Sequence, residues 1–147
     1  MDALTFTIAG PPVPQPRPRF AGGKFPRAYT PKGHPITAYR QAVTLSATIA
    51  ARGEWALTGG SVRVEIEAVF ARPPSHLRSD GTPKPGAAAF PPRGDWDNIG
   101  KGICDSITDA QVVWLDDDQV VDGRVRKRYA APGEAARTIV TVWRADP

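Results

Sequence analysis

The segment 61–71, SVRVEIEAVFA, constrains the fold more than any other part of this chain. Its apolar and charged residues alternate: one set is Val62, Val64, Ile66, Ala68 and Phe70, and the other is Arg63, Glu65 and Glu67. Successive side chains of a β-strand point to opposite faces of the sheet. The segment is therefore predicted to be a half-buried strand with its apolar face on the core.

Patterns elsewhere predict the other elements. Strands are expected at 4–9, 119–129 and 136–144, and helices at about 36–52 and 95–108. Prolines gather in two segments, 10–35 and 72–94, where we expect long loops, with no regular structure from 14 to 30. The order of elements predicts an α+β fold, a small mixed β-sheet with two main helices packed on one face.

Length and charge limit what the chain can be. With 147 residues it is expected to form one domain, residues 1–147. A net charge of +4 permits a polyanionic partner such as nucleic acid but does not establish one. The single cysteine, Cys104, suits a reducing compartment, and no apolar run approaches the roughly 20 residues of a membrane span. We therefore expect a soluble, cytoplasmic protein.

A basic loop lies near the N-terminus. Between residues 14 and 30, aromatic residues alternate with Arg17, Arg19, Lys24 and Arg27. Such a segment can contact phosphates and stack on bases, or it can be a solvated loop whose aromatic side chains pack on the core. The segment alone favours neither interpretation.

Two aspartates open the second predicted helix. Asp95 and Asp97 fall in its first turn, and Lys101 and Asp105 follow Asp97 at steps of four, which places these three on one face. An aspartate at a helix start is often only a cap. Two like charges two residues apart, however, need a cation or a raised pKa if they are partly buried.

A run of three acids, Asp116 to Asp118, precedes the last two predicted strands. Taken alone it indicates an acidic turn. The run does not fit the EF-hand pattern, and one cysteine with two distant histidines makes zinc a poor candidate. Carboxylates from separate elements favour Mg²⁺, with Mn²⁺ as a substitute, and such an ion at a scissile phosphate promotes hydrolysis.

Several motifs of this sequence resemble the RusA family of Holliday-junction resolvases. The main ones are D-x-D-N-x-x-K at 95–101 and W-L-D-D-x-Q-V-V at 114–121. G-x-P-x-P-x-x-R-P-R-F at 10–20 and K-x-Y at 127–129 are similar to phage-borne members. The combination of the first two motifs at this spacing is specific, whereas segments 53–60 and 72–92 resemble the family only in being loops.

The resemblance implies a set of site residues. Asp95, Asp97 and Asp117 would be the catalytic, metal-binding aspartates, and Lys101 would be a functional lysine. Whether Asp116 or Asp118 shares the role of Asp117 stays open. The resemblance also implies a homodimer that nicks a four-way DNA junction in pairs. Phosphate contacts are expected from Arg17, Arg19, Lys24, Arg27, Lys127 and Arg128.

Two other functions fit the same residues. One is a structure-specific nuclease with a looser choice of branched DNA. The other is a non-catalytic protein that binds branched DNA, in which the acids are only caps and an acidic turn. The two differ in whether any substrate is nicked when Mg²⁺ is added.

Overall fold

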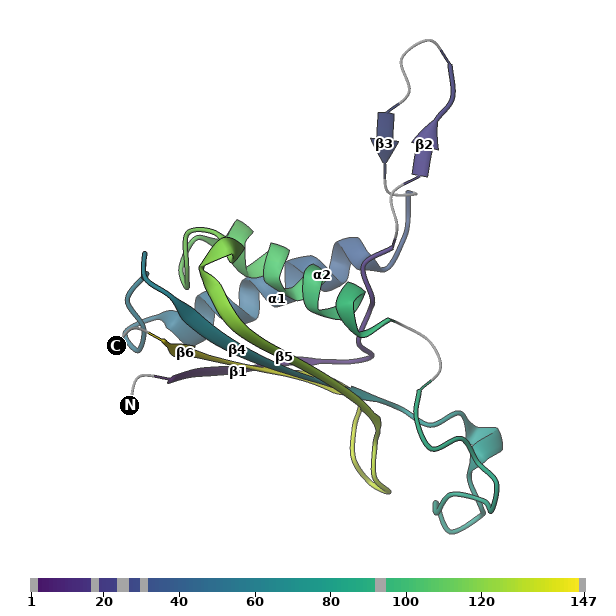
Figure 1. The fold of residues 1–147 in the computed structure, drawn as a ribbon. Helices are drawn as coiled ribbons and strands as arrows, with labels where there is room; N and C mark the ends of the chain where they lie inside the picture. Colours follow the sequence, from purple (N-terminus) through teal and green to yellow (C-terminus); the bar gives the residue numbers. More distant parts are fainter. Residues whose placement is uncertain (1–2, 17–18, 24–26, 30–31, 92–94, 146–147) are drawn as a thin grey trace.

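The computed structural model describes residues 3–16, 19–23, 27–29, 32–91 and 95–145. A four-stranded mixed sheet in the order β1-β6-β4-β5 lies under two helices, as Figure 1 shows. Its strands are β1 (Ala3–Ala9), β4 (Val62–Phe70), β5 (Val120–Tyr129) and β6 (Arg137–Arg144). The helices are α1 (Ile36–Ala51) and α2 (Trp96–Ala110). The predicted α+β class, with two helices on a small mixed sheet, is confirmed.

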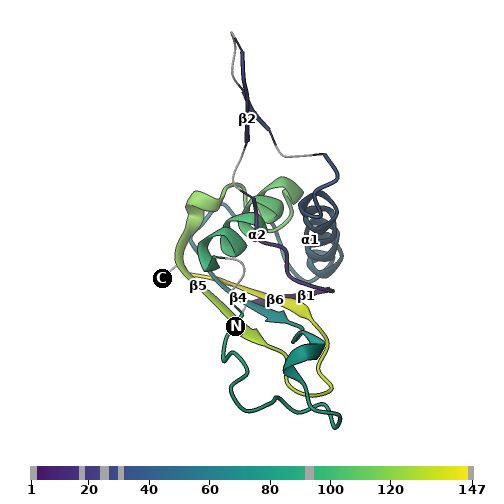
Figure 2. The same ribbon diagram turned by 90° about the vertical axis from the view of Figure 1, so that its right-hand side faces the viewer.

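Strand β4 has the faces that its alternation predicts. Its apolar residues Val62, Val64, Ile66 and Ala68 are buried, whereas Arg63 is exposed. The buried face lies under α1 and α2, and among the described residues no helix packs on the other face of the sheet (Figure 2). Each helix buries one stripe on this core, α1 with Tyr39, Val43 and Ala47 and α2 with Ile99, Ile103 and Ile107.

Strands β5 and β6 are joined by a short turn but are not neighbours in the sheet. β6 pairs antiparallel with both β1 and β4, and β5 pairs in parallel with β4. A parallel pair needs a crossover connection, and α2 lies within it. Because α2 runs opposite to both strands, the acidic run before β5 lies beside Lys101 and Asp105 in α2, whereas the acidic start of α2 lies toward the other end of the helix (Figure 1).

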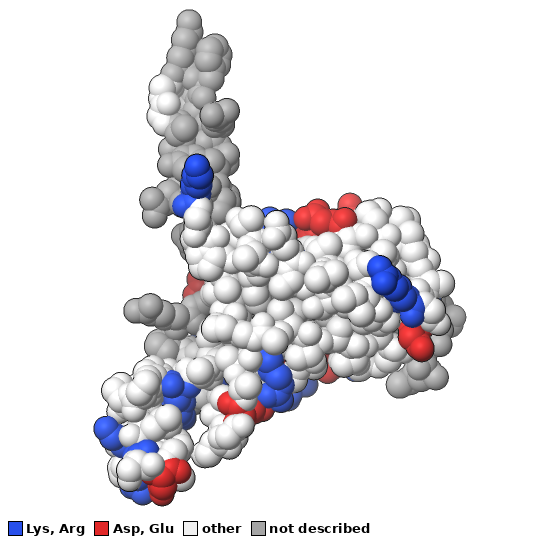
Figure 3. All heavy atoms as spheres, turned by 180° about the vertical axis from the view of Figure 1, so that it is seen from behind, with Lys and Arg blue, Asp and Glu red and all other residues white. Residues whose placement is uncertain are grey.

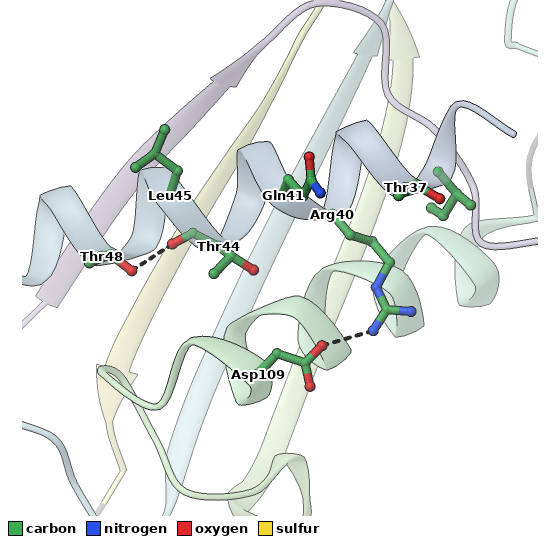
Figure 4. Close-up of a pocket in the computed structure, with 8 residues that line it drawn as sticks. Thr37, Arg40, Gln41, Thr44, Leu45, Thr48 and Asp109 are labelled. Carbon is green, nitrogen blue, oxygen red and sulfur yellow. Dashed lines mark hydrogen bonds and ion pairs between the residues drawn. The ribbon is translucent and has the colours of Figure 1, made fainter. Parts of the chain in front are cut away.

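Helices α1 and α2 meet along a polar seam. Arg40 of α1 forms an ion pair of 3.0 Å with Asp109 of α2 at the side of an open pocket (Figure 4). Further along, Thr44 donates a hydrogen bond of 3.2 Å to the carbonyl of Ser106. The seam fixes α2 against α1 on the side away from β5.

The proline-rich segment 14–30 departs from its prediction. Two short strands, β2 (Arg19–Ala21) and β3 (Arg27–Tyr29), pair antiparallel in this segment and project from the body (Figure 1). The expectation of no regular structure here was wrong. Pro18 and Pro26 precede the strands in sequence instead of interrupting them, so neither removes a donor from within a strand.

Candidate active site

Helix α2 presents the first two aspartates to solvent. Asp95 stands at the N-cap position, is exposed, and makes no capping hydrogen bond with any described residue. The Asp97 carboxylate is also exposed and accepts a hydrogen bond of 3.0 Å from the backbone N–H of Asn98. Capping therefore does not account for Asp95, and both carboxylates face solvent at the helix end whose dipole favours negative charge.

Further along the same helix, Lys101 and Asp105 form a weak pair. The Lys101 ammonium is 3.8 Å from the Asp105 carboxylate, and the lysine side chain is 63% exposed. Asp105 also accepts a hydrogen bond of 3.2 Å from the side-chain amide of Gln15. A solvated ion pair at this distance constrains Lys101 little, so its ammonium can swing toward an incoming anion.

Gln15 links the N-terminal segment to α2. Its backbone N–H donates to the carbonyl of Asn98 at 3.2 Å, and its side-chain Oε1 is buried with no hydrogen-bond partner among the described residues. A Cβ atom on Gly102 would lie 3.3 Å from the Gln15 side chain, so the two segments are in close contact. The predicted set of site residues did not include Gln15 or Asp105. Asp105 could be seen on the face of Lys101, but nothing in the sequence joins Gln15 to it.

The structure distinguishes the three acids of the run 116–118 by their hydrogen bonds and burial. Asp116 caps the short 3-10 helix η2 (Asp117–Gln119) by accepting a hydrogen bond of 3.2 Å from the Asp118 N–H. Asp116 and Asp118 are exposed, whereas Asp117 is half-buried. The acidic-turn interpretation therefore fits Asp116 and leaves Asp117 without that explanation.

The carboxyl group of Asp117 interacts electrostatically with charged side chains of α2. Burial raises the pKa of its carboxyl, as do the hydrogen bond with Asp116 and the negative charge of Asp105, while Lys101 opposes these effects. Burial and the same two acids, Asp117 and Asp105, raise the pKa of the Cys104 thiol to about 12. Cys104 is thus a neutral packing residue, and the charged form of Asp117 is disfavoured by its surroundings and would be stabilised by a nearby cation.

Two side chains hold Asp117 in place. Trp114 is fully buried and donates through its indole N–H to Thr108 at 2.8 Å. Gln119 uses both ends of its amide: its oxygen accepts from the N–H groups of Leu115 and Asp116, and its nitrogen donates to two carbonyls before β4. The tryptophan and glutamine of W-L-D-D-x-Q thus fix the loop that carries Asp117.

The three predicted metal-binding residues have the ligand type that a hard cation prefers. Asp95, Asp97 and Asp117 offer carboxylate oxygens, and a cation bound at Asp117 would oppose the burial and the neighbouring acids that raise its pKa. Within the described ranges, however, no three His, Cys, Asp or Glu side chains lie close enough together to hold a metal ion as they stand. Phosphate oxygens of a substrate and water would have to complete the coordination.

The structure describes only some of the side chains that are expected to contact phosphate. Arg17 and Lys24 lie outside the described residues, and Arg19 and Arg27 lie in β2 and β3, with side chains that are not described. The Lys127 ammonium donates to the carbonyl of Pro91 at 2.9 Å. Their contact with phosphate stays a prediction.

Arg128 has protein partners of its own. Its guanidinium binds both oxygens of Glu134, at 2.6 and 2.7 Å, and one oxygen of Glu67 at 3.2 Å. These contacts, the bond to Glu134 first, raise its pKa. Arg128 is therefore held in a network on the helix-free face of the sheet, and its role toward DNA also stays a prediction.

The structure shows an α+β domain with an acidic helix, and comparison with known protein families assigns its class as an endonuclease. Residues 9–142 match the family described as Endodeoxyribonuclease RusA. The chain belongs to the RusA family, as its motifs predicted. Membership supports an endonuclease that binds DNA and resolves Holliday junctions in recombination. A search of the curated proteins found no match. Neither helix in the described ranges is long and apolar enough to cross a membrane.

Proposed function

We propose that this chain is a metal-dependent endodeoxyribonuclease that resolves Holliday junctions by paired nicks, working as a single endonuclease domain in each subunit of a homodimer. The observation that carries the assignment of residues is the setting of Asp117. Unlike its two acidic neighbours it is half-buried, and it interacts electrostatically with Lys101 and Asp105 on the helix that begins with Asp95 and Asp97.

Each site residue has a role in this proposal. Asp95, Asp97 and Asp117 would hold Mg²⁺, or Mn²⁺ in its place, together with phosphate oxygens of the DNA. The ion supplies Lewis acidity at the scissile phosphate and lowers the pKa of water. Lys101, whose ammonium is largely exposed, would bind a non-bridging phosphate oxygen and offset the charge that develops there. Asp105, oriented by its hydrogen bond from Gln15, would keep the mobile Lys101 ammonium close to Asp117 by charge attraction.

The homodimer follows from the substrate. A four-way junction presents equivalent strands related by two-fold symmetry, and paired nicking requires two equivalent sites. A chain of 147 residues with one acidic centre supplies one of them. Sedimentation at assay concentration should give twice the chain mass, and a monomer with full cleavage activity would exclude this arrangement.

The basic residues of the N-terminal segment would bind the junction arms. Arg17, Arg19, Lys24 and Arg27, with Lys127 and Arg128, are proposed to contact backbone phosphates. Each phosphate contact releases counterions, so log affinity should fall linearly with log salt concentration. Replacing Arg17 and Arg19 with glutamine should make that slope shallower, and an unchanged slope would remove the segment from the DNA contact.

Cleavage of defined substrates tests the function. The purified protein should nick a fixed four-way junction symmetrically with Mg²⁺ or Mn²⁺ and be inactive with excess chelator. Equal cleavage of flaps would indicate a looser structure-specific nuclease. Binding without nicking in any divalent ion would indicate a non-catalytic junction-binding protein.

The likeness of residues 10–20 to phage-borne members also suggests a phage or prophage gene, which neighbouring phage genes would support and an unrelated gene context would oppose.

A further inference from the structure

The segment 71–91 between β4 and α2 is a folded lobe. It contains the short 3-10 helix η1 (Pro74–His76) and a bridge between Leu77 and Pro83. Backbone hydrogen bonds of 2.8 Å close it, from Arg78 to Thr82 and from Lys84 to His76. A long proline-rich loop with this much internal bonding has a defined surface.

Both ends of the lobe are fixed to the end of β5. Arg72 lies over the ring of Tyr129, the last residue of β5, at 4.3 Å, and His76 packs edge-on against the same ring at 5.7 Å. At the other end, the carbonyl of Pro91 accepts from the Lys127 ammonium at 2.9 Å. The strand that follows Asp117 therefore also anchors the lobe.

The exposed charge of the lobe is positive. Arg78 and Lys84 are exposed, and neither side chain has a hydrogen bond or ion pair with another described residue. The lobe contains a single acid, Asp80, which accepts hydrogen bonds from the backbone and side chain of Thr82. Figure 3 shows basic side chains gathered over this projection. Two solvated cations on a rigid support favour a polyanion as the occupant.

The lobe and the β2–β3 hairpin project from the same end of the molecule, on opposite sides of the start of α2 (Figures 1 and 2). We propose that the lobe is a second DNA-contacting element, in which Arg78 and Lys84 bind backbone phosphates of a junction arm on the side of α2 opposite the hairpin. This inference rests on the proposed function and adds a surface that the family motifs do not include.

Charge reversal in the full-length protein tests the lobe. Arg78→Glu with Lys84→Glu should weaken four-way-junction affinity on the order of tenfold at about 0.1 M salt. It should also make the slope of log affinity against log salt shallower by about 2 for each lobe of the dimer that contacts the DNA. The matched control is Arg52→Glu with Arg124→Glu, which changes net charge equally at exposed positions at the end of α1 and on the helix-free face of the sheet. The control should bind within about twofold of the unchanged protein.

The possible outcomes distinguish DNA contact by the lobe from a general effect of charge and from a failure of the proposed function. Equal losses in both double variants would reduce the effect to net charge and overturn the proposal, as would unchanged affinity in the lobe variant. A changed sedimentation mass with unchanged affinity would make the lobe a protein contact and also overturn it. If the reversed variant does not fold, Arg78→Ala with Lys84→Ala decides, with a smaller loss expected. Binding and nicking by the unchanged protein are measured alongside. If the unchanged protein binds no junction, both proposals are overturned. If it nicks normally and the lobe variant binds as tightly as it does, only the proposal for the lobe is overturned.

Discussion

Gly100 of α2 lies so close to Val125 of β5 that a Cβ atom on the glycine would approach Val125 Cγ2 to 2.8 Å. The branched valine side chain has few ways to move aside. This contact sets the distance between the helix that carries Asp97 and Lys101 and the strand that follows Asp117. The spacing of the site thus depends on a residue with no side chain.

Replacing Gly100 with alanine should both destabilise the protein and impair cleavage. Overpacking costs about 1–3 kcal/mol, against a gain in helix propensity of about 1 kcal/mol. Junction nicking should fall more than binding, because α2 must shift away from β5. Thermal unfolding and single-turnover cleavage measure the two effects.

Two further variants make this prediction specific. Gly59→Ala adds the same methyl group at a position where the nearest atom is 3.7 Å away, and it should be nearly neutral. Val125→Ala in the Gly100→Ala background removes the clashing atom and should restore part of the activity. No rescue would mean that the glycine matters for another reason.

Gln119→Glu should displace Asp117. In the unchanged protein, the Gln119 amide nitrogen donates to the carbonyls of Thr58 and Gly60 at 2.9 and 2.8 Å. Glutamate has the same shape but places an oxygen there, which cannot donate. Loss of these bonds should cost about 2 kcal/mol or more, because each unsatisfied group costs roughly 1–3 kcal/mol. Melting temperature and cleavage rate should both fall. Gln41→Glu on the exposed side of α1 is the control, and equal effects in the two would contradict the role of the amide.

Gln15→Leu should slow cleavage without weakening junction binding. The change removes the hydrogen bond that orients the Asp105 carboxylate, which pairs with Lys101 at 3.8 Å. Asp105→Asn should have a similar effect, and the double variant should be little worse than either single one, because the two residues act through one contact. Single-turnover rates with saturating enzyme measure this. Strictly additive losses would show that Gln15 and Asp105 act separately.

Glu134 should make folding stability depend on acid pH. The Arg128 guanidinium, helped by the Ala131 N–H, lowers the pKa of Glu134 to about 2. A folded-state pKa below the unfolded value of about 4.3 gives stability that is present above that pH and lost as pH falls toward 2. Glu134→Gln should therefore melt lower than the unchanged protein at pH 7, with the difference shrinking below about pH 4. The exposed Glu54→Gln is the control, and a pH-independent difference would contradict the ion pair.

Much of the fold could be predicted from local patterns, because burial on one face leaves a period in the sequence. The alternation at 62–68 identified a strand and its buried side. The place of β6 between β1 and β4 could not be predicted, since sheet order depends on long-range pairing that no single segment encodes. The end of α2 at Gln111, with a left-handed φ of 53°, also lacks the glycine that usually marks such an end.

The sequence could predict which types of residue form the candidate site, but only some of the individual residues and contacts. Asp95, Asp97 and Lys101 could be identified because their spacing on a helix is local. Asp116, Asp117 and Asp118 are chemically identical in the sequence, and only the cap at Asp116 and the burial of Asp117 distinguish them. Gln15 meets Asp105 across 90 positions of sequence, a distance over which residue spacing carries no information.

The most direct test of the site is neutralisation of Asp117 beside its two neighbours. Asp117→Asn keeps the size and one acceptor oxygen but removes the charge that a divalent cation requires, so junction nicking in Mg²⁺ should be abolished or severely reduced. Binding should be unchanged or tighter, because one charge that repels phosphate is lost. Asp95→Asn and Asp97→Asn should behave in the same way.

Asp116→Asn and Asp118→Asn are the matched controls, since asparagine caps a helix about as well as aspartate. The measurement is the single-turnover rate of nicking on a fixed four-way junction for the five variants, with affinity measured on the same substrate. The account predicts near-complete loss at Asp95, Asp97 and Asp117 with binding retained, and mild loss at Asp116 and Asp118. A folded Asp117→Asn protein that nicks at the unchanged rate would contradict it.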